Sequence, residues 1–228
     1  MLSKTKIDWA DYTINPIKGI CKHNCSYCYA RRFYKRFKWN PEIRYDLNAF
    51  KGIEKIKAGS IIFVGSTHDI FGNWIDDFVI KDIFTICDNH KNQWFVFLTK
   101  NPKRYCDFFI PKNCIIGMSI TGENIKKHKQ DWASMKGIDA LKLVSIEPLL
   151  KSINFIDLNE IFTGTSKPDW IIVGGLTPKP VHKSEWVFEI RQYCKINEIS
   201  LFEKRNLIYK NCEIVLTQGY FKEVNYFK

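Results

Sequence analysis

The stretch Ser60-Ile61-Ile62-Phe63-Val64-Gly65-Ser66-Thr67 is a short, β-branched apolar run that ends in small and polar residues. The same pattern recurs along the chain at residues 94–100, 114–121, 141–148 and 170–175. Runs that are apolar at nearly every position, rather than at alternate positions, are typical of strands buried on both faces of a parallel sheet. Each of these runs therefore predicts a buried strand.

Segments of helical character lie between the runs, at about 46–57, 75–90, 102–108, 122–135 and 182–197. Strands that alternate with helices predict βαβ units and a parallel sheet. A first strand near 14–20, interrupted by Pro16, and a last one at 199–202 bring the expected number to six or seven.

A closed eight-stranded barrel takes about 250 residues, and this chain has 228. We therefore predict an α/β fold: a partial, open parallel β/α barrel of about six strands, TIM-barrel-like, with a doubly wound sheet as the alternative. Residues 1–228 contain no linker or low-complexity tract, which predicts a single domain.

The composition is that of a globular domain with an anionic partner. Apolar residues make up 45% and charged residues 26%, and the net charge is +11. This excess favours nucleic acid or a nucleotide as partner, although a solvated basic surface with no specific ligand remains an alternative. No apolar run approaches the roughly 20 residues that span a bilayer, and residues 1–8 are too polar for a signal peptide.

We therefore expect a cytoplasmic protein with no membrane association, in which cysteines stay reduced, bind metal or are buried. Five cysteines stand singly among apolar neighbours and are predicted to be buried structural thiols: Cys87, Cys106, Cys114, Cys194 and Cys212.

The chemistry is expected in the stretch Cys21-Lys22-His23-Asn24-Cys25-Ser26-Tyr27-Cys28. Its three thiolates can converge on a metal centre, whereas structural zinc and most iron–sulfur clusters take four protein ligands. The missing ligand indicates an open, reactive metal position. Thiolate selects zinc, copper(I) or iron–sulfur centres; zinc with His23 as fourth ligand and a redox dithiol at Cys25 and Cys28 remain alternatives to a cluster.

A helix is predicted directly after this loop, over residues 29–38, which contain no Gly or Pro. Its basic residues interleave with aromatic ones and are candidates for binding nucleic-acid phosphates: Arg31, Arg32, Lys35 and Arg36. The solvated side of an amphipathic helix would explain the same pattern.

The spacing Cys-x3-Cys-x2-Cys, with Tyr27 before the last cysteine, resembles the signature of the radical S-adenosylmethionine superfamily. The resemblance implies a partial α/β barrel and a 4Fe–4S cluster held by Cys21, Cys25 and Cys28. S-adenosylmethionine would chelate the remaining iron, and an electron from a donor protein would release a 5′-deoxyadenosyl radical.

A closer resemblance extends over about residues 8–204. It rests on Asp8-Trp9, Asn15-Pro16, Cys28-Tyr29-Ala30, Phe63-Val64-Gly65-Ser66, Leu98-Thr99-Lys100, Ser145-Ile146-Glu147-Pro148-Leu149 and Val173-Gly174-Gly175. This set is similar to that of a phage-associated three-cysteine-motif family of unknown function, which implies the same cofactors but no known substrate.

The superfamily resemblance also implies residues that bind S-adenosylmethionine. Tyr27 would contact the adenine. Gly65, Ser66 and Thr67 stand where the methionine amino group is bound, and because the usual Glu is missing, Ser66, Thr67 or Asp69 would accept its hydrogen bonds. The residues that would bind the ribose hydroxyls or the carboxylate are Ser119, Thr121, Glu123 and Asn124.

Gly174 and Gly175 would let the backbone approach the adenine, and a tight turn explains them equally well. Lys100 and Glu147 follow apolar strands directly and are the candidate catalytic residues on the substrate side. Lys100 would bind the S-adenosylmethionine carboxylate or a substrate phosphate, and Glu147 a cation or hydroxyl; a Lys100–Glu147 pair is the structural alternative.

His68 should also face this site, although a lone histidine is more often structural. Residues 202–205 are expected to close the barrel mouth.

The sequence thus predicts a radical S-adenosylmethionine enzyme acting on an unidentified substrate, nucleic acid or a nucleotide derivative by preference. A partner protein would present the substrate, because no separate substrate domain is evident. The alternative is a non-enzymatic, zinc-bearing nucleic-acid-binding module.

Overall fold

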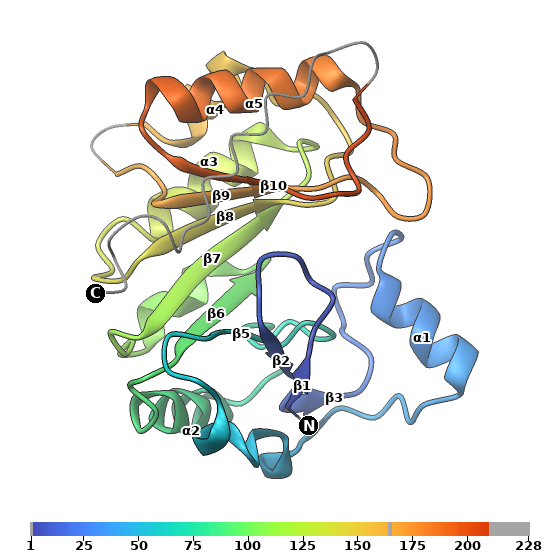
Figure 1. The fold of residues 1–228 in the computed structure, drawn as a ribbon, viewed down its shortest axis with the longest axis vertical. Helices are drawn as coiled ribbons and strands as arrows, with labels where there is room; N and C mark the ends of the chain where they lie inside the picture. Colours follow the sequence, from blue (N-terminus) through green and yellow to red (C-terminus); the bar gives the residue numbers. More distant parts are fainter. Residues whose placement is uncertain (1, 164–165, 210–228) are drawn as a thin grey trace. The chain divides into compact units, whose positions relative to one another are not determined.

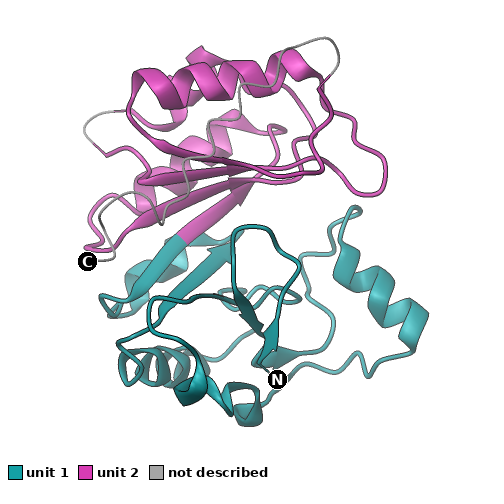
Figure 2. Cartoon of the chain, viewed as in Figure 1, with its two compact units in different colours: residues 1–116 teal, residues 117–228 magenta. Residues whose placement is uncertain are grey.

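The computed structural model describes residues 2–163 and 166–209. The chain divides into two compact units, Met1–Ile116 and Gly117–Lys228 (Figure 2), and each is described by itself. The prediction of a single domain over residues 1–228 stays a prediction. Cys212, expected as a buried thiol, lies outside the described residues.

In unit 1, strand β2 (Tyr12–Ile14) pairs in parallel with β5 (Ile61–Val64), and β5 pairs in parallel with β6 (Trp94–Thr99) (Figure 1). Thr13 stands opposite Phe63, which stands opposite Val96. The short strand β1 (Ser3–Lys4) runs antiparallel to β2, and β3 (Ile17–Lys18) forms a separate antiparallel pair with β4 (Arg44–Tyr45). The α-helices are α1 (Tyr29–Phe37) and α2 (Asp77–Asp88).

The core of unit 1 forms where the apolar strands pack against α2. Ile62 of β5, Phe95 of β6 and Ile83 of α2 are fully buried. The buried ring of Phe71, between β5 and α2, lies 4.3 Å from that of Tyr105 and 5.9 Å from that of Phe84, between ring centroids. This apolar layer holds the carboxyl ends of β5 and β6 in place.

Unit 2 contains the parallel strands β8 (Lys142–Ile146), β9 (Trp170–Val173) and β10 (Ser200–Glu203). The helices among its described residues are α3 (Ile125–Ser134), α4 (Phe155–Ile161) and α5 (Ser184–Ile196). The buried ring of Phe162, just after α4, lies 5.0 Å from Trp132 of α3 and 6.1 Å from Tyr193 of α5. These rings give unit 2 its own core.

Strand β7 (Cys114–Ile120) begins in unit 1 and ends in unit 2. Among the described residues, hydrogen bonding orders eight strands as β1-β2-β5-β6-β7-β8-β9-β10. All five buried runs predicted from the sequence form strands, β5 to β9, and the last predicted strand is β10. The predicted α/β class with a mostly parallel sheet is confirmed.

Several elements differ from prediction. Residues 46–57 contain two 3-10 turns, η1 (Leu47–Phe50) and η2 (Ile53–Lys55), because Gly52 with φ of 91° separates them. Residues 102–108 form a 3-10 segment, η3 (Pro102–Asp107). The first predicted strand is divided into β2 and β3 around Pro16, which has no N–H to donate to a ladder.

Helix α4 was not predicted, since it spans only 7 residues. Cys106 is exposed, so the prediction that it is buried is wrong. Cys87, Cys114 and Cys194 are buried, as expected. Within residues 2–163 and 166–209 no helix is long and apolar enough to cross a membrane. The cytoplasmic location stays a prediction.

Candidate functional site

The cysteine loop begins at Gly19, which two buried side chains hold by its backbone. Its N–H donates to the Tyr34 hydroxyl of α1 at 2.7 Å, and its carbonyl accepts from His68 Nδ1 at 3.1 Å. Gly19 has φ of 98°, and a Cβ there would lie 2.3 Å from the Glu42 carbonyl oxygen. Only glycine fits this entry to the loop.

The thiols of Cys21, Cys25 and Cys28 are all half-buried. Asn24 turns the loop in the left-handed region, with φ of 53°, and the Cys28 N–H donates to the Cys25 carbonyl at 3.2 Å. Burial raises the pKa of Cys21, and the backbone N–H groups of Asp69 and His23 partly offset this by favouring its thiolate.

The three thiols are not gathered around one point. Across the described part of the chain, no three His, Cys, Asp or Glu side chains are placed to hold one metal ion. The donor set nevertheless fits an iron–sulfur cluster in kind, because thiolates are its usual ligands and N–H groups directed at sulfur are part of its usual surroundings. Binding would require the loop between Cys21 and Cys28 to tighten.

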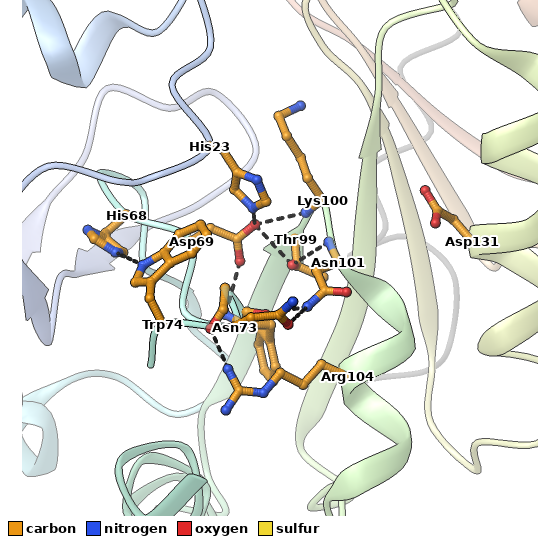
Figure 3. Close-up of polar contacts among 12 residues, drawn as sticks. His23, His68, Asp69, Asn73, Trp74, Thr99, Lys100, Asn101, Arg104 and Asp131 are labelled. Atoms are coloured by element: carbon orange, nitrogen blue, oxygen red, sulfur yellow. Dashed lines mark hydrogen bonds and ion pairs between the residues drawn. The ribbon is translucent and has the colours of Figure 1, made fainter. Parts of the chain in front are cut away.

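Asp69 joins this loop to the ends of two strands (Figure 3). Its Oδ2 accepts hydrogen bonds from His23 Nε2 at 2.7 Å, from Thr99 Oγ1 at 3.0 Å and from the Lys100 N–H at 2.9 Å. Its side chain is 8% exposed. Burial alone would raise the pKa of Asp69, but the hydrogen bonds from His23, Lys100 and Thr99 outweigh it and lower the pKa.

Lys100 makes a second link between the loop and the end of β6. Its ammonium lies over the ring of Tyr27, 5.4 Å from the centroid, in a cation–π contact. The structure thus brings together three of the residues predicted from the sequence: Tyr27, Asp69 and Lys100.

The turn after β5 contains three further predicted residues and is held by one that was not predicted. The Asn15 Oδ1 accepts from Ser66 Oγ at 3.1 Å and from the Thr67 N–H at 3.0 Å. Gly65 has φ of 83°, and a Cβ there would meet the Ile70 side chain at 2.8 Å. Asn15 follows β2, so the strand-end rule that identified the other residues would also have identified it.

His68 has a structural role. Its Nε2 accepts from Trp74 Nε1 at 2.9 Å, which leaves Nδ1–H to donate to the Gly19 carbonyl (Figure 3 shows the Trp74 bond). Burial lowers the pKa of His68 and so favours this neutral form. The ring positions the start of the loop, and both of its nitrogens are engaged in hydrogen bonds.

In unit 2, the predicted residue Glu147 forms an ion pair with Lys204, which follows β10. Gly174 allows this pair to form, since a Cβ there would lie 2.9 Å from Lys204 Cδ and 3.1 Å from Glu147 Cδ. Lys204 was expected at the barrel mouth, but its pairing with Glu147 was not predicted.

Gly175 is clamped by Asn206, a residue that was not predicted from the sequence. The Gly175 N–H donates to Asn206 Oδ1 at 3.1 Å, and its carbonyl accepts from Asn206 Nδ2 at 2.7 Å. A Cβ on Gly175 would lie 2.8 Å from both the Asn206 carbonyl oxygen and His182 Cε1. The space beside both glycines is therefore filled by side chains and backbone of unit 2.

The remaining predicted residues lie at the end of β7. Ser119 is half-buried within the strand, and Thr121 is buried, with its Oγ1 3.3 Å from Glu123 Oε2. Asn124 caps α3 by accepting from the Lys127 N–H at 3.0 Å. Glu203, in the segment expected to close the barrel mouth, instead binds Arg191 with two hydrogen bonds of 2.8 Å.

Comparison with known proteins gives a family and a fold. The model of the family described as "Protein of unknown function (DUF5131)" matches residues 4–218. No curated protein matches the chain. The phage association expected from the sequence has no support in these comparisons.

Solved structures of spore photoproduct lyase resemble this chain. A mutant of that enzyme with bound AdoMet and dinucleoside spore photoproduct matches with a TM-score of 0.65 and 14% identity, covering 89% of this chain and 78% of that chain. The lyase complexed with dinucleoside spore photoproduct matches with the same TM-score of 0.65 and the same identity of 14%. This match covers 92% of this chain and 79% of that chain. At this identity the likeness shows the fold, a partial TIM barrel.

Proposed function

The chain belongs to DUF5131, a family of unknown function, and we propose that it is a radical S-adenosylmethionine enzyme. The observation that carries the proposal is the Cys21–Cys28 loop, tied by His23 to Asp69 in the segment after β5. The thiols therefore belong to the carboxyl-end side of unit 1, where parallel α/β folds bind ligands. Spore photoproduct lyase, which has a similar fold, binds AdoMet in one of its structures.

Cys21, Cys25 and Cys28 would hold a 4Fe–4S cluster, for which three soft thiolates are suitable donors. The cluster and S-adenosylmethionine, when bound, supply a 5′-deoxyadenosyl radical that removes hydrogen from the substrate, with the electron provided by a donor protein. The N–H groups of His23 and Asp69 keep the Cys21 sulfur in a polar, donor-rich position.

Unit 1 would bind S-adenosylmethionine through the turn of Gly65, Ser66 and Thr67, with the polar turn atoms accepting from the methionine amino group. Tyr27 would contact the adenine. Asp69 already accepts three hydrogen bonds on Oδ2, so we assign it to positioning the loop rather than to direct contact. Lys100 presents its ammonium beside Tyr27 and would bind a carboxylate or a phosphate.

In unit 2 we keep Ser119, Thr121, Glu123 and Asn124 as candidates for the ribose or carboxylate. Asn124 would serve through its N–H groups, since its Oδ1 caps α3. Glu147, held by Lys204, would position a substrate hydroxyl. Gly174 and Gly175 are assigned to close packing within unit 2, with adenine contact as the further role to be tested.

The substrate we propose is a nucleic acid or a nucleotide derivative. The net charge of +11 supports an anionic substrate. Helix α1 follows the cysteine loop directly and exposes Arg32, Lys35 and Arg36, with Arg31 half-buried. The fold is also similar to that of a lyase solved with a dinucleoside spore photoproduct.

The test is anaerobic purification of the protein followed by measurement of iron, sulfide and S-adenosylmethionine cleavage. We expect about four irons per chain and formation of 5′-deoxyadenosine after reduction. Joint replacement Cys21→Ala, Cys25→Ala and Cys28→Ala should abolish both.

The matched control is Cys106→Ala, which removes an exposed thiol outside the loop and should leave both readouts at the wild-type level. If the protein contains zinc, no iron, and forms no 5′-deoxyadenosine, the proposal is wrong and the alternative of a zinc-bearing nucleic-acid-binding module is favoured. A full cluster in the triple variant would remove these cysteines as its ligands.

A further inference from the structure

Helix α1 and the residues that follow it expose a row of aromatic side chains. Tyr29 is 41% exposed, Phe33 40%, Phe37 51% and Trp39 46%. Tyr29, Phe33 and Phe37 are spaced four residues apart and so lie along one side of the helix. Ala30 and Tyr34, one position further on, form the buried side. The exposed row therefore lies next to the buried side of α1, and the Tyr29 hydroxyl also bonds to unit 1.

The row is a continuous surface rather than a set of isolated rings. The centroids of Tyr29 and Phe33 are 5.7 Å apart, and those of Phe33 and Phe37 are 6.0 Å apart. Lys38 ends the helix in the left-handed region with φ of 49°, which turns Trp39 back onto Phe37, at 5.5 Å and 25° between ring planes. A lysine in this conformation costs free energy, so the turn that completes the row is maintained against a local preference.

The segment that carries the row is positive and contains no aliphatic anchor. Residues 29–41 carry no Asp or Glu, and Arg32, Lys35 and Arg36 are exposed on the same helix. The guanidinium of Arg36 lies 5.4 Å from the Phe37 ring centroid. Residues 29–41 also contain no Leu, Ile, Val or Met, the side chains on which protein-docking and membrane-binding helices usually depend.

We propose that Tyr29, Phe33, Phe37 and Trp39, hereafter the aromatic row, form a stacking platform for single-stranded nucleic acid, with the basic residues of α1 binding its phosphates. Exposed rings beside cations are the combination by which proteins bind single strands without sequence preference. A duplex keeps its bases paired and stacked about 3.4 Å apart, so it cannot place them on rings whose centroids are about 6 Å apart, whereas an unpaired strand can. Bases that each cover one ring must be separated from one another.

The aromatic row begins at the candidate site. Tyr29 directly follows Cys28, and its hydroxyl donates to the Ser66 carbonyl in the turn after β5. A strand lying along α1 would therefore bring a nucleotide to the cysteine loop. Figure 1 shows α1 at the periphery of unit 1. This inference deepens the proposed function and rests on it only for the reaction that follows binding.

Binding is tested by fluorescence anisotropy of a labelled oligothymidylate of about 12 nucleotides, alongside the matching duplex. The full chain should bind the single strand more tightly than the duplex. Phe33→Ala with Phe37→Ala should weaken single-strand binding at least about tenfold, without changing the salt dependence. Lys35→Gln with Arg36→Gln should instead reduce the salt slope by about 0.7 for each phosphate that is no longer neutralised.

Two further variants separate stacking from general apolar contact. Phe33→Leu with Phe37→Leu retains bulk but removes the rings, and should bind as weakly as the alanine variant. Phe188→Ala removes an equally exposed ring (50%) from α5 and should bind as wild type does. Circular dichroism verifies that each variant is folded.

The inference is overturned if the single strand does not bind, if it binds the leucine variant as tightly as wild type, or if the duplex is preferred. Binding to phosphatidylserine vesicles that requires Phe33 and Phe37, without single-strand binding, would assign the row to a membrane surface instead. Ring-dependent binding in a protein that cannot cleave S-adenosylmethionine would overturn the proposed function alone. Cleavage without such binding would overturn the platform alone.

Discussion

The carboxylate of Asp69 shows how a single residue organises unit 1. Its Oδ2 receives hydrogen bonds from His23 of the cysteine loop and from Thr99 and Lys100 at the end of β6. Three donors directed at one oxygen require an ionised acceptor, and hydrogen bonds to charged groups contribute more than neutral ones. The negative charge of Asp69 is thus used for structure.

We expect Asp69→Asn to lower the free energy of unfolding by about 2 kcal/mol, since the amide has less charge to offer and its NH₂ group opposes the donors. Urea denaturation measures the change. Asp107→Asn is the control, because Asp107 is exposed and surface changes usually stay within about 0.5 kcal/mol. Equal stabilities for the two variants would contradict this role.

The sequence identified Asp69 by its place after a buried strand, but it did not identify its partner. His23 is 46 residues away, and no local pattern encodes a contact at such a distance. Asn206 was missed for the same reason, because it acts on a turn 31 residues away. Asn15 follows β2 and could have been identified by its place, but not by its contact with a turn 52 residues away. Residue types at strand ends are readable from sequence, whereas the pairs they form depend on the completed fold.

Among the elements, the turn after β5 depends most clearly on one backbone conformation. Gly65 combines φ of 83° with a close approach to Ile70 and to the His68 carbonyl oxygen. A side chain there would be strained and would displace the segment that leads to Asp69.

Gly65→Ala should therefore destabilise the protein by at least about 1 kcal/mol. Gly137→Ala provides the control, since nothing lies within 4 Å of its Cβ position and the change should be neutral or slightly stabilising. Thermal melting of both variants measures the difference. If Gly65→Ala melts at the temperature of Gly137→Ala, the turn tolerates a side chain.

Element prediction succeeded where burial dictates the pattern. The apolar runs of β5 to β9 could be recognised because strands covered on both faces have no polar side. The stretch 46–57 has no such constraint, and Gly52 with its positive φ ends one 3-10 turn before the next begins. Helix α4 is short and depends on a capping box between Asn154 and Asp157, which is a weaker signal than an apolar stripe.

At the scale of the whole molecule, the buried His68 and the half-buried His182 make stability depend on pH. The pKa of His182 is lowered by burial, and its Nε2 accepts the Ile208 N–H at 3.0 Å. The pKa of His68 is lowered for the same reason. Since the unfolded chain binds these protons at higher pH than the folded chain does, the stabilisation is complete above pH of about 6.5 and is lost as the pH falls below it.

We expect the urea concentration at the unfolding midpoint to be lower at a pH of about 5 than at a pH of about 8. The midpoint of the His182→Gln variant should decrease less over the same pH range, because a glutamine carbonyl can accept the Ile208 N–H without titrating. The midpoints of both proteins at the two pH values measure the effect. An identical fall in wild type and variant would remove His182 as a contributor.

The anchors of the cysteine loop have a consequence for how the enzyme would mature. Gly19 is held by Tyr34 and His68, and His23 is held by Asp69, entirely through protein atoms. The entrance of the loop is therefore held by contacts within the polypeptide itself. Under the proposed function, a cluster would be inserted at an entrance that the polypeptide already holds, and the loop between Cys21 and Cys28 would tighten around it.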